Sequence, residues 1–179
     1  MTDLDGEKER YITYELGLLS RQAALSTRDR KSPVYAKGVK EHQKGPAKDA
    51  VLAVLKDNRT TYLAGGISEE DHIAYIEQTA TKLSSSIGKY LHNGRFRIGV
   101  AQKLVNVHLK YLWTAGLIRE PPHCPIDGII RDIAKINYDW IVSDSIKEYR
   151  EAIAGLKSEA GSASLSVWEL VNFRRRGDR

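Results

Sequence analysis

The block Arg97-Ile98-Gly99-Val100-Ala101-Gln102-Lys103 is the segment whose residue types are best suited to contact nucleic acid. A tight turn through Gly99 would end one helix and begin another, which is the form of a helix-hairpin-helix. The N–H groups at the start of the second helix could then hold a phosphate without reading base sequence. We therefore predict that DNA is contacted by Arg95, Arg97, Gly99, Ala101, Gln102 and Lys110.

The distribution of charge supports this interpretation. From Gln78 to Arg119 the sequence contains no Asp or Glu but seven Lys or Arg residues, whereas the rest of the chain holds 21 basic and 23 acidic residues. The net charge of +5 therefore arises in this one segment, and a further basic run covers residues 174–176. Such a surface attracts the phosphate backbone of nucleic acids. The alternative is a solvated face that lacks acids, with residues 174–176 as a solvated tail.

His123 and Cys124 are adjacent, as in a pair of metal ligands, but no other His or Cys stands at ligand spacing. We therefore expect no metal site, and Cys124 is more typical of a small buried residue than of a nucleophile. A single cysteine also excludes an internal disulfide framework and indicates a reducing, cytoplasmic compartment.

The segment from Gly99 to Lys103, followed by Cys124-Pro125-Ile126-Asp127, resembles the helix-hairpin-helix DNA glycosylase superfamily. The Pro-Ile-Asp ending is most similar to the archaeal 8-oxoguanine DNA glycosylase branch. The resemblance covers roughly residues 85–145. Ala101 stands where the family usually has a second hairpin glycine, and 24 positions separate Lys103 from Asp127, a few more than in the commonest members.

The resemblance implies that Lys103 is the nucleophile that attacks the sugar C1′ and that Asp127 is the catalytic carboxylate. The chain would then be an enzyme, a DNA glycosylase with abasic-site lyase activity, which needs no metal or cofactor. Nearby cations and burial would have to lower the pKa of the lysine. The alternatives are that Lys103 is an ordinary solvated lysine and that Asp127 is only a helix N-cap.

Base excision requires the nucleotide to be flipped out of double-stranded DNA into a pocket. The candidates for stacking on that base are Trp113, Tyr138 and Trp140, although Trp140 and Trp168 also suit a hydrophobic core. The resemblance indicates an oxidised purine, and a hypermodified phage base, with a role in defence, is a second possibility. The competing hypothesis is a non-catalytic helix-hairpin-helix module of a larger complex. A protein–protein adaptor would leave the acid-free segment unexplained.

The elements that must position these residues are helical, because apolar residues recur at helical spacing and strand-like alternation is nearly absent. We expect an all-α, two-lobed single domain over residues 1–179, with a cleft between the lobes. The first helix should span about 7–28, with Tyr11 and Tyr14 packed inward, and a basic loop should follow to about residue 45. Ser68 should cap another helix.

In the next helix, Val100, Leu104, Val107 and Tyr111 form the expected buried face, which leaves Lys103, Asn106 and Lys110 on a neighbouring stripe. A proline-rich loop should lead into a helix near Ile126-Asp127, and another should run to about residue 157. Residues 155–164 should form a flexible connection, and Ser166 to Glu169 should be a capping box for a final short helix.

Composition sets the outer bounds. Of the 179 residues, 41% are hydrophobic and 28% charged, which is typical of a globular domain. No apolar run reaches the ~18–20 residues of a membrane span, and the acidic N-terminus is unlike a secretory signal. We therefore expect a soluble monomer that binds DNA rather than a membrane.

Overall fold

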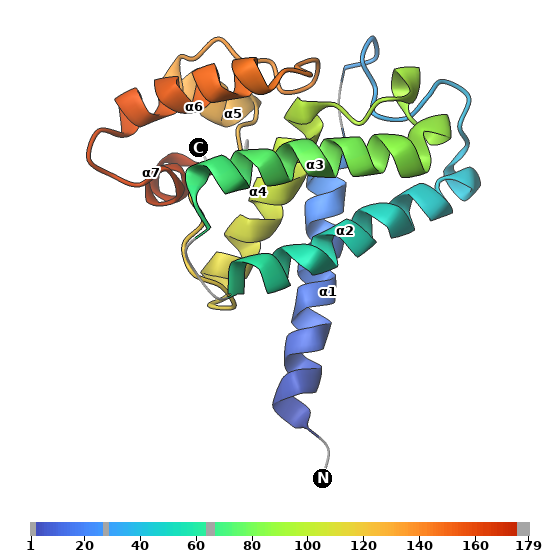
Figure 1. Ribbon diagram of the computed structural model, residues 1–179, viewed down its shortest axis with the longest axis horizontal. Coiled ribbons are helices and arrows are strands. Elements are labelled where there is room, and N and C mark those ends of the chain that lie inside the picture. Colours follow the sequence, from blue (N-terminus) through green and yellow to red (C-terminus); the bar gives the residue numbers. More distant parts are fainter. Residues whose placement is uncertain (1–2, 27–28, 64–66, 175–179) are drawn as a thin grey trace.

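The computed structural model describes residues 3–26, 29–63 and 67–174, and these residues form helices without any β-strand (Figure 1). The expected all-α class is confirmed. Helices α1 to α4 form a bundle, and α5, α6 and α7 lie together at one side of it (Figure 1). No described helix is long and apolar enough to cross a membrane.

Helix α4 (Ile98–Thr114) is the centre of the molecule and packs against α1, α2, α3 and α6. The predicted apolar face is present, but burial extends around most of the helix. Asn106, which the sequence pattern placed on a stripe beside the buried face, is wholly buried, and Lys103 and Lys110 are partly buried. A helix enclosed by four others has no solvated face, so its polar side chains must find partners inside the protein.

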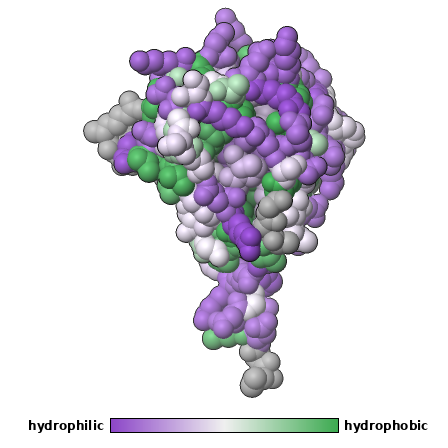
Figure 2. Space-filling model, turned by 60° about the vertical axis from the view of Figure 1, so that its left-hand side comes forward, coloured by the Kyte–Doolittle hydropathy of each residue, from purple (hydrophilic) through white to green (hydrophobic). Residues whose placement is uncertain are grey.

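Helix α1 (Leu4–Leu25) buries small residues, namely Gly17, Ser20 and Ala24. The prediction that Tyr11 and Tyr14 pack inward is wrong, because they are 62% and 52% exposed. Small side chains let the backbone of α1 come close to its neighbours, and the tyrosines lie on other faces of the helix. The N-terminal part of α1 projects from the body of the molecule, whose visible face is largely hydrophilic (Figures 1 and 2).

Helices α2 (Gly45–Leu63) and α3 (Glu69–Ile87) complete the bundle. The predicted cap of α3 is confirmed, since the Ser68 hydroxyl accepts a hydrogen bond from the Asp71 amide at 3.1 Å. The sequence also predicts a chain break at Gly65-Gly66, which lies outside the described residues. The basic loop before α2 contains the short turn η1 (Glu41–Gln43), and it pairs with the segment after α3 through hydrogen bonds from Ala36 N to Tyr90 O and from His92 N to Val34 O, both 2.9 Å.

The predicted tight hairpin through Gly99 is not what joins α3 to α4. Residues 88–97 intervene, as two 3-10 turns, η2 (Gly88–Tyr90) and η3 (His92–Gly94), followed by an extended stretch. Gly99 itself lies in the first turn of α4. The sequence also predicts a turn at His92-Asn93-Gly94, and this turn is present as η3, in which Asn93 adopts a left-handed conformation with φ of 54° that Asn tolerates better than most residues.

The C-terminal helices are α5 (Gly128–Ala134), α6 (Ile146–Ala160) and α7 (Leu165–Asn172). Two boundary predictions are wrong. Residues 155–160 are helical, because Gly155 lies where α6 packs against Ile136 rather than at a break. The cap of α7 is Ser164, whereas the Ser166 hydroxyl donates a hydrogen bond to Pro121 O at 2.8 Å and so joins α7 to the proline-rich loop.

Candidate active site

Lys103 lies on the side of α4 that faces the loop between α5 and α6. Its Nζ is 3.8 Å from the centroid of the Trp140 ring, so the amine is covered by an aromatic face. Burial lowers the pKa of Lys103, and the negative charge of Asp127 acts in the opposite direction. Partial desolvation therefore favours the neutral amine, which is the form that can act as a nucleophile.

Asp127 is the N-cap of α5, and its Oδ1 accepts hydrogen bonds from Ile129 N at 2.9 Å and Ile130 N at 3.1 Å. Among the described residues, every hydrogen bond to this carboxylate goes to Oδ1. Asp127 is thus a helix cap, in agreement with one interpretation of the sequence, and its Oδ2 is still available to a ligand. The cap fixes the orientation of the carboxylate at the positive end of the helix dipole.

Lys103 and Asp127 line the same cavity, which has a volume of about 640 Å³ and is open to solvent. Trp140 and Ile141 form another part of its wall, and the remaining charged side chains around it are Asp29, Arg131 and Asp139. Among the described ion pairs none joins Lys103 to Asp127, although their charges interact. The side chains of Lys103 and Asp127 therefore border one space that is open to solvent.

Gln102 positions the loop segment that leads into Asp127. Its Nε2 donates to Ile126 O at 2.7 Å, and its Oε1 accepts from Ile126 N at 3.1 Å. The side chain is completely buried, so it does not contact DNA as we predicted. This pair of hydrogen bonds holds the residue before Asp127 against α4, next to Lys103. Nothing in the local sequence indicates such a partner 24 positions away.

Gly99 allows the loop that carries Trp140 to touch α4. A Cβ atom built on Gly99 would lie 2.1 Å from Trp140 O, and the Gly99 amide donates to Ser143 O at 2.9 Å. The amide of Ile98 donates to Asp144 Oδ1 at 3.0 Å. These two amides at the start of α4 are thus satisfied by the protein itself, which differs from the predicted phosphate-binding turn.

A Gly99→Ala substitution should therefore destabilise the fold strongly. The added methyl group collides with backbone rather than with a flexible side chain, so the loop at Trp140 must move, and we expect the free energy of unfolding to fall by about 3 kcal/mol. Urea denaturation followed by circular dichroism measures this change. Gly45→Ala, where the added Cβ has no neighbour within 4 Å, is the control. Equal stability of the two variants would contradict the close approach.

A buried polar network lies behind the site and was not anticipated from the sequence. The Tyr62 hydroxyl lies close to His72 Nδ1, His72 Nε2 lies 3.0 Å from Asn106 Oδ1, and Asn106 Nδ2 donates to the Tyr149 hydroxyl at 3.1 Å. The Tyr149 hydroxyl is 2.8 Å from Nδ1 of His123.

Only one assignment of donors and acceptors is consistent with these hydrogen bonds. Asn106 Oδ1 can only accept, so His72 carries its proton on Nε2, and its Nδ1 accepts from Tyr62. Tyr149 accepts from Asn106 and so donates to His123 Nδ1. Both histidines are therefore neutral, and burial lowers their pKa values to about 3 for His72 and about 4 for His123. The network joins to Gln102 through Asn106, and so fixes the part of α4 beside the site.

The other residues assigned to DNA contacts are engaged within the protein. Arg97 is buried, and its guanidinium donates to Ile141 O at 2.7 Å, Ser32 O at 3.0 Å and Pro33 O at 3.2 Å. Arg95 pairs with Asp144, and Lys110 pairs with Glu169 between side chains that are 15% and 3% exposed. Ala101 is buried in the core. Much of the acid-free segment is therefore interior, and two of its cations, Arg95 and Lys110, are paired with carboxylates.

Of the three candidate stacking residues, only Trp140 lines the cavity of Lys103. Tyr138 is buried in the core, and Trp113 packs near the far end of α4, about 15 Å along the helix at 1.5 Å per residue. Cys124 is buried, and burial raises the pKa of its thiol, which keeps it protonated. The described residues include no cluster of three or more His, Cys, Asp or Glu that could hold a metal ion.

Comparisons with protein-family models, with curated proteins and with solved structures find no match for this chain. The function must therefore be inferred from the geometry and chemistry of the site.

Proposed function

We propose that the chain is a DNA glycosylase with abasic-site lyase activity, in which Lys103 is the nucleophile and Asp127 the catalytic carboxylate. The observation that carries this proposal is that a partly buried amine and a carboxylate with one oxygen free of protein hydrogen bonds line the same open cavity without forming an ion pair. A partly buried lysine whose charge is disfavoured, near an oriented carboxylate, suits amine catalysis.

The reaction would proceed by attack of the neutral Nζ of Lys103 on C1′ of a flipped nucleotide. The N-glycosidic bond breaks, and the departing base takes its electron pair and a proton. The Asp127 carboxylate stabilises the positive charge that develops on the sugar and can accept a proton from the attacking nitrogen. Loss of that proton and opening of the sugar ring, with O4′ protonated, leave a Schiff base between Lys103 and C1′. Trp140 lines the cavity in which the flipped nucleotide would bind, but its ring is covered by Lys103 and only 6% exposed, so we do not assign base stacking to it.

The basic loop between α1 and α2 is the surface that we propose for the phosphate backbone, in place of the start of α4. Here a second cavity of about 620 Å³ is lined by Arg30, Lys31, Lys37 and Lys44; no acidic residue lines it, although Lys44 forms an ion pair with Glu41. The guanidinium of Arg97 donates hydrogen bonds to Ser32 O and Pro33 O in this loop and to Ile141 O in the wall of the Lys103 cavity. Arg97 therefore links the basic loop to the candidate site.

A double substitution, Lys31→Ala with Lys37→Ala, should weaken binding to a DNA duplex of any sequence. Both side chains are exposed. Each lost phosphate contact reduces the slope of log K against log salt concentration by about 0.9, so we expect a decrease of about 1.8. Fluorescence anisotropy from 50 to 200 mM salt measures the slope. The control is Lys135→Ala with Lys147→Ala, which removes two exposed lysines elsewhere, and the same decrease in that control would contradict the assignment.

The activity itself is tested by borohydride trapping of the wild-type protein on duplexes that contain oxidised purines, deaminated bases, abasic sites or glucosylated bases. Borohydride reduces the Schiff base to a stable amine, so a covalent protein–DNA adduct identifies both the chemistry and the substrate. Formation of an adduct with at least one duplex is the expected result. No adduct and no released base on any duplex, with salt-dependent binding retained, would instead indicate a non-catalytic DNA-binding module.

A further inference from the structure

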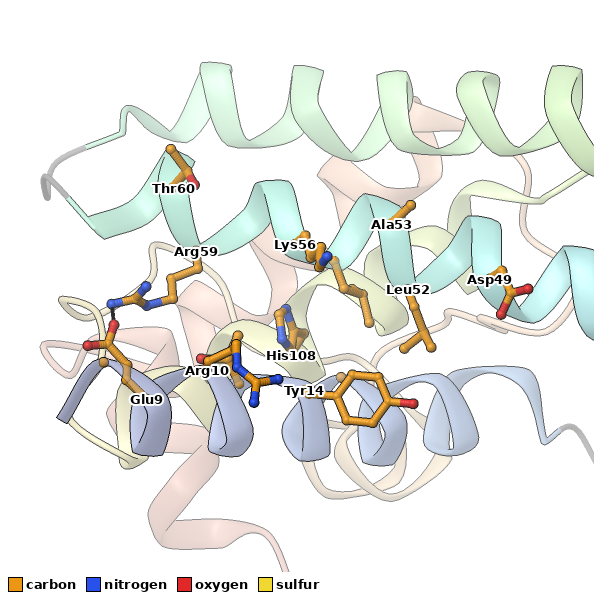
Figure 3. Close-up of a pocket in the computed structure, with 14 residues that line it drawn as sticks. Glu9, Arg10, Tyr14, Asp49, Leu52, Ala53, Lys56, Arg59, Thr60 and His108 are labelled. Atoms are coloured by element: carbon orange, nitrogen blue, oxygen red, sulfur yellow. Dashed lines mark ion pairs between the residues drawn. The ribbon is translucent and has the colours of Figure 1, made fainter. Parts of the chain in front are cut away.

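A further cavity, separate from that of Lys103, lies between α1 and α2 and has a volume of about 700 Å³ (Figure 3). Its walls are mostly apolar and include Gly17, Leu52 and Leu55. His108 of α4 lies between the two helices at the back of the cavity (Figure 3). This volume is within the range of small-molecule sites, which combine an apolar wall with a few placed polar groups.

The ring of His108 presents a hydrogen-bond donor to this cavity. The Tyr75 hydroxyl donates to Asn58 Oδ1 at 2.5 Å, so the amide nitrogen of Asn58 faces His108 Nδ1, at 3.1 Å. Nδ1 therefore accepts, and the proton of the neutral ring is on Nε2. His108 is 1% exposed, and its Nε2 has no protein partner among the described residues. A buried N–H without an acceptor destabilises a protein, which makes this group a candidate for binding a ligand.

Thr13 supplies a second polar group on the α1 side of the cavity. Its hydroxyl is buried and makes no hydrogen bond within the described part of the chain. Arg59 and Glu9 form an ion pair between α2 and α1 at the rim, and Lys56 and Arg10 are exposed there (Figure 3). The cavity thus offers the His108 N–H and the Thr13 hydroxyl, together with the buried Nε of Arg59, whose charge is balanced by its ion pair with Glu9.

We infer that the α1–α2 cavity binds an uncharged, amide-bearing heterocycle of about nucleobase size, with its carbonyl oxygen on His108 Nε2. An uncharged acceptor is favoured because Arg59, the partly buried cation that lines the cavity, already pairs with Glu9 and leaves no net charge to balance a buried anion. A cyclic amide also carries an N–H next to its carbonyl, and the Thr13 hydroxyl can accept from it. This site is independent of the proposed reaction at Lys103, which lies on another side of α4.

The test is saturation-transfer NMR with the full chain and three probes, namely uracil, hypoxanthine and nicotinamide, compared with toluene as a probe of similar size that lacks an acceptor. At least one amide probe should bind more tightly than toluene and shift the His108 Nε2 resonance. Ala53→Trp, at an exposed residue that lines the cavity, should weaken that binding at least tenfold. Ala74→Trp places the same side chain at an exposed position of α3 that does not line the cavity, and it should leave the binding unchanged.

His108→Phe and Thr13→Val identify the polar contacts. Each should reduce the preference for the amide probe over toluene, and Thr13→Val keeps the shape of the side chain, so it is informative even if His108→Phe fails to fold. Binding of none of the amide probes would overturn the inference and leave only water at His108. Amide binding that is unaffected by Ala53→Trp, or toluene binding as tight as the amides, would also overturn it.

Discussion

Replacing Lys103 with alanine should abolish the borohydride-trapped adduct, because the variant has no amine that can form a Schiff base in the cavity. We expect the free energy of unfolding to change by no more than about 1 kcal/mol, since the lost contact with Trp140 is offset by removal of a partly buried charge. Trapping yield and urea denaturation measure the two effects. An adduct that persists in Lys103→Ala would show that another amine is the nucleophile.

Lys103→Arg and Asp127→Asn separate the chemical roles from binding. Arginine keeps the positive charge but is not deprotonated in proteins, so Lys103→Arg should bind DNA and form no adduct. Asparagine is as good a helix cap as aspartate, so Asp127→Asn should fold normally and lose most of the rate of adduct formation. Lys147→Ala removes an exposed lysine that lines neither the cavity nor the basic loop and should retain full activity. Weak DNA binding by Lys103→Ala, Lys103→Arg and Asp127→Asn, with adduct formation retained, would favour a binding role for these two residues.

Acidification should unfold the protein between about pH 5 and pH 4. Burial lowers the pKa values of three histidines, to about 3 for His72 and about 4 for His108 and His123, relative to 6.5 in the unfolded chain. A histidine with a lowered folded pKa contributes stability that is present above pH 6.5 and is lost as pH falls toward the folded value. At pH 5 the loss is about 2 kcal/mol for each residue and about 6 kcal/mol in total. That is comparable with the stability of a whole domain.

Glutamates with shifted pKa values modify this dependence at lower pH, and Glu69 and Glu169 are two of them. Lys157 and His123 lower the pKa of Glu69, so its contribution is lost below pH 4.5 and adds to the effect, whereas burial raises the pKa of Glu169, which acts in the opposite direction. Urea denaturation at pH 7, 6 and 5 measures the free energy of unfolding. In the folded state, NMR titration should find the three buried rings neutral down to pH 5. A histidine among these three that titrates with a midpoint near pH 6.5, or an equal free energy of unfolding at pH 7 and pH 5, would contradict the buried network.

Local signals predicted the helices well, because caps and helical periodicity depend on residues a few positions apart. Ser68 caps α3 as expected, and Asp127 lies at the start of α5. The boundaries that failed depend on distant contacts. Gly155 suggested a break but serves helix packing, and Ser166 suggested a cap but bonds to the proline-rich loop.

The sequence by itself determined the helical class, the candidate pair Lys103 and Asp127, and the excess of positive charge. Tertiary structure decided which of those residues border a cavity. Gln102, Gly99 and Arg97 share the basic segment with Lys103, yet they bond to loops far along the chain, and of these four residues only Lys103 lines a cavity. The physical reason is that α4 is enclosed by other helices, so each polar group on it must be paired internally or open into a cavity, and that choice depends on neighbours the local sequence does not specify.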